Sequence, residues 1–248
     1  MNKVVLITGA AKGIGKAIAL ELSKNGYDIV INYLTSRKEA DNLASTIRNI
    51  FKVRCIAIQA DVSSEQEVDA MISEIENKLG GVDILINNAA VDLSNMFHLK
   101  TADEFRRTLD VNVVGAYNCA KRVYRHMLDN EDGVIINISS TNGMNTYYPM
   151  CFDYDASKAA LNSLTHDLAV QFSPYIRVNA IAPGFIGTEK ELDGYDDKFL
   201  KEEIDKIMVK RYGKPEDVAY LVKFLISPEA SFINNTIIRI DGGQMGSV

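Results

Sequence analysis

Short runs of apolar, often β-branched residues alternate along the chain with longer segments of helical periodicity. The runs predict strands at residues 4–8, 28–32, 53–59, 84–88, 134–139, 177–182 and 236–241. Most of these runs are apolar throughout, so we expect helices to cover both faces of the sheet that they form. The alternation is typical of βαβ units and predicts an α/β fold with a seven-stranded parallel sheet in three layers, αβα.

The helical segments lie at residues 14–25, 37–49, 64–79, 101–127, 155–172, 196–207 and 215–226. In the first of them Ile14, Ile18 and Leu22 recur every four residues and form one apolar stripe that can pack on the sheet. No internal repeat and no linker divides the chain, so we expect a single domain over residues 1–248. Residues 188–206 are rich in Glu, Asp and Lys, and we expect them to be the least ordered stretch, a mobile lid.

Composition and charge narrow the classes of protein that fit this pattern. Of the 248 residues, 47% are hydrophobic, which is enough for a substantial core. A net charge of −6 without a Lys/Arg-rich run argues against nucleic acid as a partner. Strand-like sequence begins at Val4 and no apolar run approaches a membrane span, so we expect a soluble, cytoplasmic protein that binds no membrane. The spacing of the three cysteines and three histidines predicts free thiols and no metal site.

A glycine-rich segment, Thr-Gly-Ala-Ala-Lys-Gly-Ile-Gly, occupies residues 8–15 between the first strand and the first helix. Small residues let the backbone turn sharply and approach a pyrophosphate, whose charge is attracted by the N–H groups at the start of a helix. An ordinary glycine-rich turn is the alternative. The placement of the segment between strand and helix favours a dinucleotide site.

Tyr154 and Lys158 lie four residues apart in a helical segment and therefore share one face. A free tyrosine, with a pKa of about 10, is a poor proton shuttle near neutral pH, and an adjacent ammonium group lowers that pKa by favouring the phenolate. The strand at 134–139 ends in two hydroxyl groups, those of Ser139 and Ser140, upstream of this pair. The alternative for these serines is a strand-end hydroxyl that bonds to local backbone.

The glycine spacing resembles the TGxxxGxG turn of the short-chain dehydrogenase/reductase family, and the motifs from residue 8 to residue 243 are similar to that family over essentially the whole chain. The resemblance implies a doubly wound Rossmann domain and an enzyme that transfers hydride between a nicotinamide cofactor and a carbonyl or secondary alcohol. It assigns the proton donor to Tyr154, a hydrogen bond to the substrate oxygen to Ser140, with Ser139 as the alternative, and orientation of the nicotinamide ribose to Lys158. Asn112 would distort its helix and hold a water that links the lysine to solvent.

The same resemblance implies a cofactor site at the carboxyl ends of the strands. Its residues would be Gly9, Ala11, Lys12, Gly13, Ile14, Gly15, Asn32, Tyr33, Ser36, Arg37, Asp61, Val62, Asn88, Ala89, Ala90, Tyr154, Lys158, Pro183, Gly184, Ile186 and Thr188. The second strand ends in Asn32 and Tyr33, without the acidic residue that an NAD enzyme typically places there. With Lys12 and Arg37 nearby to meet a 2′-phosphate, we expect NADP(H) to be preferred over NAD(H). The alternative is that both cations are solvated surface charges.

Two departures from the family pattern concern this site. Ala90 stands where the Asn-Asn-Ala-Gly motif of the family ends in glycine, and its methyl group tightens the turn. Tyr154 follows Ser140 by fourteen positions, one more than is usual in the family. The family pattern therefore does not predict the shape of the 144–153 loop or of the substrate pocket.

The tail and the overall pattern look most like the 3-oxoacyl-[acyl-carrier-protein] reductase branch of the family, which implies a 3-oxoacyl thioester on a carrier as the substrate. Asp129, Glu131 and Asp132 would repel an acidic carrier, although Arg122 and Arg125 precede them. The family also implies a homotetramer.

Two other functions stay open. One is a reductase or dehydrogenase of free ketones, sugars or steroid-like alcohols, whose apolar pocket would be lined by Tyr147, Tyr148, Pro149, Met150 and Phe152. The other is a non-catalytic NADP(H)-sensing regulator, which the complete Ser/Tyr/Lys set argues against because a sensor needs no proton donor.

Overall fold

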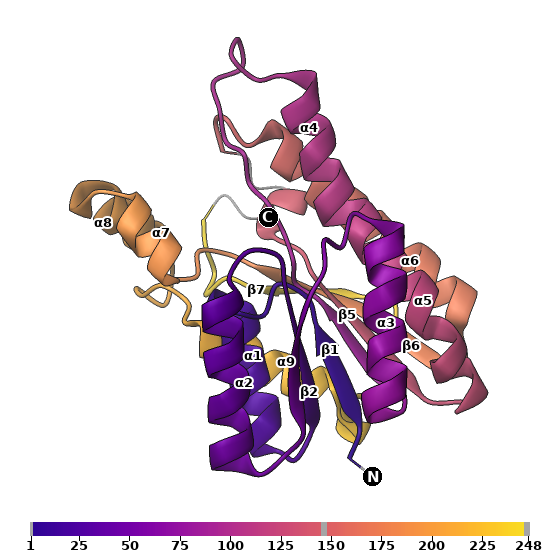
Figure 1. Cartoon of the computed structure of the whole chain (residues 1–248). Helices are drawn as coiled ribbons and strands as arrows, with labels where there is room; N and C mark the ends of the chain where they lie inside the picture. The colour runs from indigo at the N-terminus through magenta and orange to yellow at the C-terminus, as the bar shows by residue number, and fades with distance from the viewer. Residues whose placement is uncertain (1, 145–147, 246–248) are drawn as a thin grey trace.

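The seven expected strands form one parallel sheet in the computed structural model, which describes residues 2–144 and 148–245 (Figure 1). The strands are β1 (Val4–Ile7), β2 (Asp28–Tyr33), β3 (Cys55–Gln59), β4 (Ile84–Asn87), β5 (Gly133–Ile138), β6 (Ile176–Pro183) and β7 (Ile237–Ile240). Their order is β3-β2-β1-β4-β5-β6-β7, and every neighbouring pair is parallel. The predicted α/β fold with a seven-stranded parallel sheet is confirmed.

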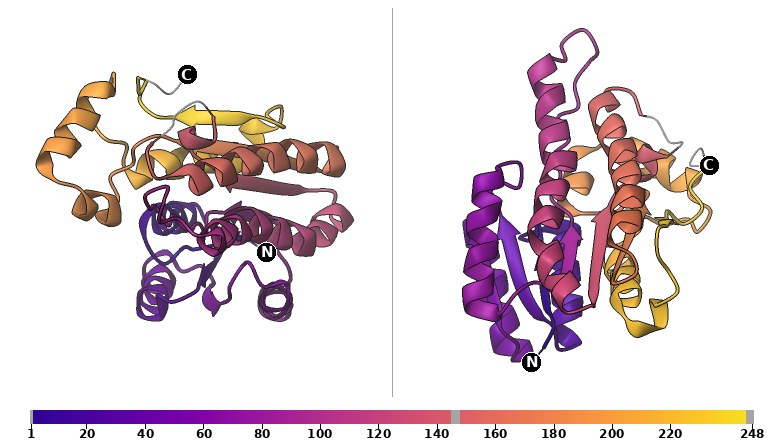
Figure 2. Two further views of the ribbon diagram at one scale, coloured as in Figure 1. Left: turned by 90° about the horizontal axis from the view of Figure 1, so that it is seen from above. Right: turned by 90° about the vertical axis from the view of Figure 1, so that its right-hand side faces the viewer.

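Helices cover both faces of this sheet. The helices are α1 (Gly13–Lys24), α2 (Arg37–Phe51), α3 (Glu65–Leu79), α4 (Ala102–Leu109), α5 (Gly115–Asp129), α6 (Phe152–Phe172), α7 (Glu189–Gly194), α8 (Asp197–Lys206) and α9 (Pro215–Ile226). One layer consists of α1, α2 and α9, and the other of α3, α5 and α6 (Figure 2). The three-layer prediction is therefore confirmed.

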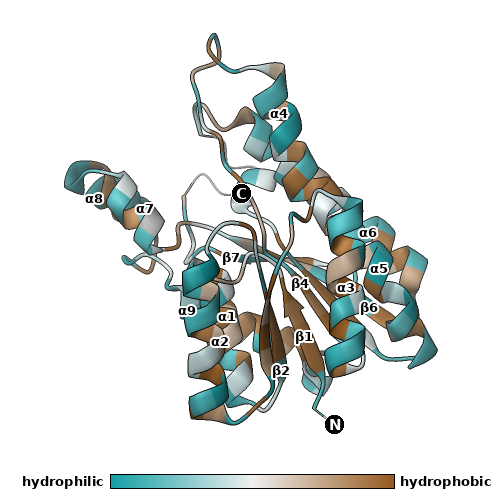
Figure 3. Ribbon diagram, viewed as in Figure 1, coloured by the Kyte–Doolittle hydropathy of each residue, from teal (hydrophilic) through white to brown (hydrophobic). Residues whose placement is uncertain are grey.

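The sheet has a buried core on each face, which explains the continuous apolar runs of the sequence (Figure 3). In β1, Val5 and Ile7 pack into the core beneath α1, α2 and α9, whereas Val4 and Leu6 pack into the core beneath α3, α5 and α6. Successive residues of a strand point to opposite faces, so a strand with both faces covered needs apolar residues throughout.

The order of the strands sets the position of the site. From β1 the chain proceeds through β2 to β3 on one side, and then returns to place β4 on the other side of β1. The connections after β1 and β4 therefore diverge and leave a crevice outside the carboxyl ends of these strands, where ligands bind in open α/β sheets.

Two segments differ from the expected elements. The long helix expected at 101–127 is divided into α4, a π-helical turn (Asp110–Val114) and α5, and α4 rises beyond the carboxyl edge of the sheet (Figure 1). The expected lid, residues 188–206, contains α7 as well as the expected α8; α7 is a six-residue helix that begins after the cap Thr188. The three cysteines are free, as predicted. None of the helices formed by the described residues is both long and apolar enough to cross a membrane.

Candidate active site

The turn after β1 adopts a left-handed conformation that suits glycine. Gly9 has a φ of +61° and Gly13 a φ of +54°, a region that residues with a side chain rarely adopt. A Cβ atom on Gly9 would also lie only 2.9 Å from the Cα atom of Ala89. Glycine therefore allows the chain after β1 to pass directly against the chain after β4.

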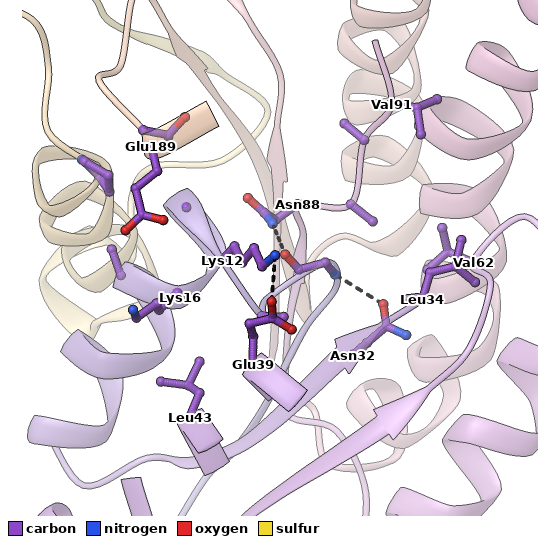
Figure 4. A pocket seen from close by; sticks show the side chains of 18 of the residues that line it. Lys12, Lys16, Asn32, Leu34, Glu39, Leu43, Val62, Asn88, Val91 and Glu189 are labelled. Atoms are coloured by element: carbon purple, nitrogen blue, oxygen red, sulfur yellow. Dashed lines mark hydrogen bonds and ion pairs between the residues drawn. The ribbon is translucent and has the colours of Figure 1, made fainter. Parts of the chain in front are cut away.

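Polar side chains hold this turn between β2 and β4. The Nδ2 group of Asn88 donates hydrogen bonds to the carbonyl oxygens of Thr8 (2.9 Å) and Gly9 (3.1 Å). The Thr8 hydroxyl oxygen in turn accepts from the N–H groups of Asn88 and Ala89, both at 2.9 Å. From the side of β2, the Oδ1 atom of Asn32 accepts from the Gly9 N–H group at 3.2 Å (Figure 4). Residues from three strand ends thus form one rim.

A cavity of about 1170 Å³ opens along this rim. The predicted cofactor residues that line it are Gly9, Ala11, Lys12, Gly13, Asn32, Asp61, Val62, Asn88, Ala89, Ala90 and Thr188. The predicted site residues that are not among its lining residues are Ile14, Gly15, Tyr33, Ser36, Arg37, Asn112, Ser140, Tyr154, Lys158, Pro183, Gly184 and Ile186. At the cavity, α1 begins without a capping side chain and without an acidic residue in its first turn. Its first N–H groups can therefore bind an anion.

Two ion pairs at the cavity wall were not expected from the sequence. The ammonium group of Lys12 lies 2.8 Å from a carboxylate oxygen of Glu39, which belongs to the first turn of α2 (Figure 4). The guanidinium group of Arg107 lies 2.8 Å from the carboxylate of Asp61. The sequence analysis considered only the residues at the end of the second strand, whereas the start of α2 brings the carboxylate of Glu39 to the glycine turn.

Arg37, the second cation expected to meet a 2′-phosphate, is not among the residues that line the cavity. Its guanidinium donates a hydrogen bond to Oε1 of Gln59 at 3.1 Å and lies 6.0 Å from the centroid of the Tyr33 ring. Ser36 is the N-cap residue of α2 and makes no side-chain capping bond. These three predicted residues thus surround the end of β2 rather than the cavity.

Tyr154 and Lys158 share one face of α6, as their spacing predicts. The Nζ atom of Lys158 lies 5.4 Å from the centroid of the Tyr154 ring. It donates a hydrogen bond of 2.8 Å to the carbonyl oxygen of Ile138, and only 2% of the residue is exposed. The end of β5 therefore fixes the ammonium group beside the phenol.

The two serines after β5 have different surroundings. The Ser139 hydroxyl donates a hydrogen bond of 2.6 Å to Oδ1 of Asn162 and so ties the strand end to α6 inside the protein. The Ser140 hydroxyl donates to Oδ1 of Asn142 and its oxygen accepts from the N–H group of Asn142, both at 3.2 Å. It also lies close enough to the Tyr154 phenol to lower the pKa of that phenol. Of the two hydroxyl groups, that of Ser140 is therefore the one that contacts Tyr154.

The ionisation of this pair differs from the expectation. Burial raises the pKa of the Tyr154 phenol, and the negative charge of Asp92 adds to the rise, whereas the hydrogen bond with Ser140 opposes it. Burial also lowers the pKa of Lys158 to about 8. The expected lowering of the tyrosine pKa is therefore wrong for the chain's own groups, because desolvation disfavours the phenolate more than its neighbours favour it.

Asn112 lies in the π-helical turn between α4 and α5, so the expected distortion of this helix is confirmed. Its Oδ1 atom accepts from the Val91 N–H group (2.8 Å), and its Nδ2 group donates to the Val91 carbonyl oxygen (3.0 Å) and the Ser157 hydroxyl oxygen (2.9 Å). The Ser157 hydroxyl donates to the carbonyl oxygen of Tyr154 (2.7 Å). Asn112 therefore joins the chain after β4 to the helix that carries Tyr154.

The predicted segment after β6 lies along the same edge of the sheet. Pro183 ends β6, and a Cβ atom on Gly184 would lie 2.6 Å from the Cβ atom of Asp241, which leaves no room for a side chain. Ile186 is buried. Thr188 lines the cavity, and its hydroxyl oxygen accepts from a backbone N–H group of α7 at 3.3 Å. The segment thus connects the cavity to α7.

Acidic residues that the sequence analysis did not single out surround Tyr154. The negative charges of Asp92 and Glu191 both raise the pKa of its phenol. Asp155 accepts a hydrogen bond of 2.7 Å from Asn142, and burial, together with the charge of Asp92, raises the pKa of its carboxyl group. Within residues 2–144 and 148–245, no group of three or more His, Cys, Asp or Glu side chains could hold a metal ion.

Part of the expected aromatic pocket is used for internal contacts. The Tyr148 hydroxyl donates to Oε2 of Glu203 in α8 (2.9 Å) and accepts from Nε2 of Gln244 (2.8 Å). Phe152 packs edge-on against Phe97, with ring centroids 5.6 Å apart. Pro149 and Met150 are exposed, and Tyr147 lies outside the described residues. Tyr148 therefore connects the loop before α6 with α8 and the C-terminal segment.

Comparison with known proteins places this fold and site in a family. A family model described as enoyl-(acyl carrier protein) reductase matches residues 9–245. The 3-oxoacyl-[acyl-carrier-protein] reductase FabG of Staphylococcus epidermidis is 36% identical over 245 residues, which cover 98% of this chain and 99% of that protein. Glucose 1-dehydrogenase 2 of Bacillus subtilis is 34% identical over 246 residues, which cover 98% and 95%. The chain belongs to the short-chain dehydrogenase/reductase family and is an oxidoreductase of carbonyl or alcohol groups, as predicted.

Solved structures with the same fold hold both nicotinamide cofactors. A 7α-hydroxysteroid dehydrogenase complexed with NADH and 7-oxo glycochenodeoxycholic acid has a TM-score of 0.93 and 32% identity, covering 98% of this chain and 94% of that chain. A gluconate 5-dehydrogenase from Burkholderia cenocepacia in complex with NADP and tartrate has a TM-score of 0.90 and 31% identity, covering 98% and 95%. The fold therefore fits NAD(P) cofactors without fixing which of the two is preferred.

Proposed function

We propose that this chain interconverts a carbonyl and a secondary alcohol with NADP(H), and that Tyr154 is the proton donor and acceptor. The observation that carries the proposal is the contact of Tyr154 with both Lys158 and Ser140 at the carboxyl edge of the sheet. The dinucleotide cavity opens at the same edge, and Val91 is one of the residues that line it. Asn112 is hydrogen bonded both to Val91 and to Ser157, which lies in the helix that carries Tyr154.

The proposed cofactor residues fit a dinucleotide. The cavity is larger than most pockets for drug-sized ligands, and the uncapped start of α1 offers N–H groups to a pyrophosphate. Asp61 and Val62 line the part of the wall that follows β3, and Thr188 lines the part that follows β6. We assign the predicted residues that line the cavity, together with Tyr154 and Lys158, to cofactor binding, with Lys12 as the cation that favours NADP(H). When bound, the cofactor supplies or accepts the hydride.

The chain's own residues handle the proton. The raised pKa keeps the Tyr154 phenol protonated at neutral pH, so its Oη atom can donate a proton to a substrate oxygen that gains negative charge. The Ser140 hydroxyl donates a hydrogen bond to the same oxygen. Lys158 adds positive charge beside the phenol and would hold the nicotinamide ribose of a bound cofactor. Asn112 holds α6 in register with the cavity wall.

The first candidate substrate is a 3-oxoacyl thioester, because the curated relatives named 3-oxoacyl-[acyl-carrier-protein] reductase align over nearly the whole chain. The second candidate is an uncharged free ketone or sugar. It is favoured by the carboxylates of Asp92, Asp155 and Glu191 around Tyr154, which would repel an anionic substrate or carrier. The relative named glucose 1-dehydrogenase 2 also supports it.

A coupled assay distinguishes these candidates. NADPH and NADH oxidation would be followed with an acetoacetyl thioester, an acyl chain bound to a carrier protein, and small free ketones and sugars. The first candidate predicts the highest kcat/KM for a thioester, and the second predicts it for an uncharged free carbonyl. Absence of turnover across the whole panel, with NADPH bound, would contradict both.

We further propose the organisation in which this activity takes place. The chain 1–248 acts as one domain, and residues 188–206 move as a lid, which contacts the loop before α6 through the hydrogen bond of Tyr148 with Glu203. The protein is a homotetramer, consistent with the family, and its three free thiols fit a reducing, cytoplasmic compartment.

A further inference from the structure

The ion pair between Lys12 and Glu39 lies in the part of the cavity where the fold would place the 2′-phosphate of NADP(H). Lys12 belongs to the turn after β1 and Glu39 to the first turn of α2, and both line the dinucleotide cavity (Figure 4). Their charged atoms are 2.8 Å apart, and their side chains are 58% and 44% exposed. In a doubly wound fold, the adenosine ribose binds beside the end of β2. The pair is therefore formed but open to solvent and to a ligand.

Three other cations lie on or near this wall, and two of them are engaged by other side chains. Arg107 is engaged by Asp61 and Ser63, at 2.8 Å and 2.7 Å. Arg37 is bonded to Gln59 and is not among the lining residues. Lys16 lines the cavity from α1 and forms no ion pair with the residues that the structure describes. Lys12 is thus the cation of the glycine turn, and it already forms an ion pair with the carboxylate of Glu39.

A 2′-phosphate and a 2′-hydroxyl interact oppositely with such a pair. A phosphate monoester carries a charge of about −1.5 to −2 at neutral pH, so it must take Lys12 from Glu39 and then remain beside the displaced carboxylate. The hydrogen bond from Lys12 lowers the pKa of the Glu39 carboxyl group, which is therefore ionised at neutral pH. A ribose hydroxyl, in contrast, can donate to a carboxylate without breaking the pair.

We propose that Glu39 is a specificity-determining residue, whose carboxylate competes with the 2′-phosphate for Lys12 and limits the preference for NADP(H) over NAD(H). This inference rests on the proposed function, because it requires the cavity to bind a nicotinamide dinucleotide. The cofactor preference would then depend on whether Lys12 pairs with the Glu39 carboxylate or with the 2′-phosphate. Removal of the carboxylate should therefore increase the preference for NADP(H).

Binding of nucleotides that lack the nicotinamide tests the proposal without any turnover. Calorimetry would compare adenosine 2′,5′-bisphosphate with 5′-AMP on the wild type and on Glu39→Gln. We expect the bisphosphate to bind about five- to tenfold more tightly to the variant, the size of effect expected when one exposed charge beside it is removed, and 5′-AMP to change by less than about twofold. The matched control is Asp41→Asn, which makes the same charge change on an exposed residue of α2 outside the cavity lining. It should leave both affinities unchanged.

A second background separates competition for Lys12 from simple repulsion. In Lys12→Gln, the bisphosphate should bind more weakly than to the wild type, and adding Glu39→Gln should then have little further effect. The proposal is overturned if Glu39→Gln leaves or weakens bisphosphate binding, if Asp41→Asn reproduces its effect, or if the effect persists undiminished without Lys12. Failure of both nucleotides and of NADPH to bind the wild type would instead reject the dinucleotide site, and this inference with it.

Discussion

Lys158 serves the proposed site, but its buried ammonium group lowers the stability of the folded protein. Its ammonium group is buried with a single hydrogen bond, to the carbonyl oxygen of Ile138, and has no carboxylate partner within the part of the chain that the structure describes. Burial lowers its pKa to about 8, against about 10.4 for a lysine in an unfolded chain. The charged form is therefore less stable in the folded protein than in the unfolded one. A buried cation of this kind is retained for the site rather than for stability.

We expect Lys158→Met to be inactive but more stable than the wild type, by roughly 1–3 kcal/mol at pH 7. Between pH 8 and about 10 the unfolded wild type binds a proton that the folded one does not, so its free energy of unfolding rises in this window. The advantage of the variant should therefore shrink towards pH 10. Urea unfolding at pH 7 and pH 9.5 measures both, with the exposed Lys198→Met as control; a variant that is less stable at pH 7 contradicts the expectation.

Single alanine substitutions separate the roles of the two serines. Ser140→Ala removes a hydroxyl that contacts Tyr154 and should lower kcat by about 10²- to 10³-fold with little change in stability. Ser139→Ala leaves Asn162 without its buried donor and should lower stability by about 1–3 kcal/mol while kcat changes far less. Steady-state kinetics and thermal unfolding of both variants check this pair of outcomes. The reverse pattern would assign the catalytic hydroxyl to Ser139.

At this scale, the motif residues could be predicted from the sequence, whereas their electrostatic partners could not. Tyr154 and Lys158 are linked by a fixed helical spacing, so their contact follows from local sequence. Glu39 meets Lys12 only because β1 and β2 are neighbours and α2 starts over the glycine turn. The carboxylates around Tyr154 likewise come from separate connections, and no spacing in the sequence links them.

A buried ion pair connects the β4–α4 connection to the start of α6. Lys100 is 4% exposed and Asp153 0%, and their charged atoms are 2.6 Å apart. Lys100 also donates to the carbonyl oxygen of Leu93, and the Thr108 hydroxyl donates to Asp153 at 2.6 Å. Asp153 directly precedes Tyr154, so this cluster fixes the N-terminal start of α6, the helix that carries the phenol.

Removing the lysine from this pair should be strongly destabilising. Lys100→Met leaves the Asp153 carboxylate buried without its cation, and we expect a loss of about 3–5 kcal/mol in the free energy of unfolding. The double variant Lys100→Met/Asp153→Asn should recover part of the loss, because no charge remains buried. The control is Lys78→Met, which breaks an exposed pair with Glu74 and should lose less than about 1 kcal/mol. Equal losses in the two single variants would show that burial is not the cause.

The elements themselves could be predicted where a period continues over several turns. All seven strands and most helices follow from their hydrophobic pattern, because both faces of the sheet are covered. The six-residue α7 is too short to show a period, and a capping Thr188 alone does not identify a helix. A local distortion of the helix at Asn112 was expected from the family resemblance, but the hydrogen bonds of its amide with Val91 and Ser157 depend on the tertiary fold.

At the scale of the whole molecule, the order of the strands places the predicted site segments at one edge of the sheet. The oligomeric state, which we propose to be a homotetramer, is a separate property that can be tested. Val114 and Tyr117 expose apolar surface at the start of α5, although the rest of this helix packs on the sheet. We expect Tyr117→Arg to shift the protein from tetramer to smaller species, measured by light scattering on a sizing column. Lys78→Met serves as control; a wild type that elutes as a monomer contradicts the tetramer.

The most direct test of the account is the rate of carbonyl reduction by Tyr154→Phe, measured together with NADPH binding. The variant keeps the aromatic ring beside Lys158 and removes only the proton that the phenol supplies. We predict that kcat falls by about 10²- to 10⁴-fold while the dissociation constant for NADPH changes by less than about twofold. A kcat near that of the wild type, with NADPH binding intact, would contradict the assignment of Tyr154 as the proton donor.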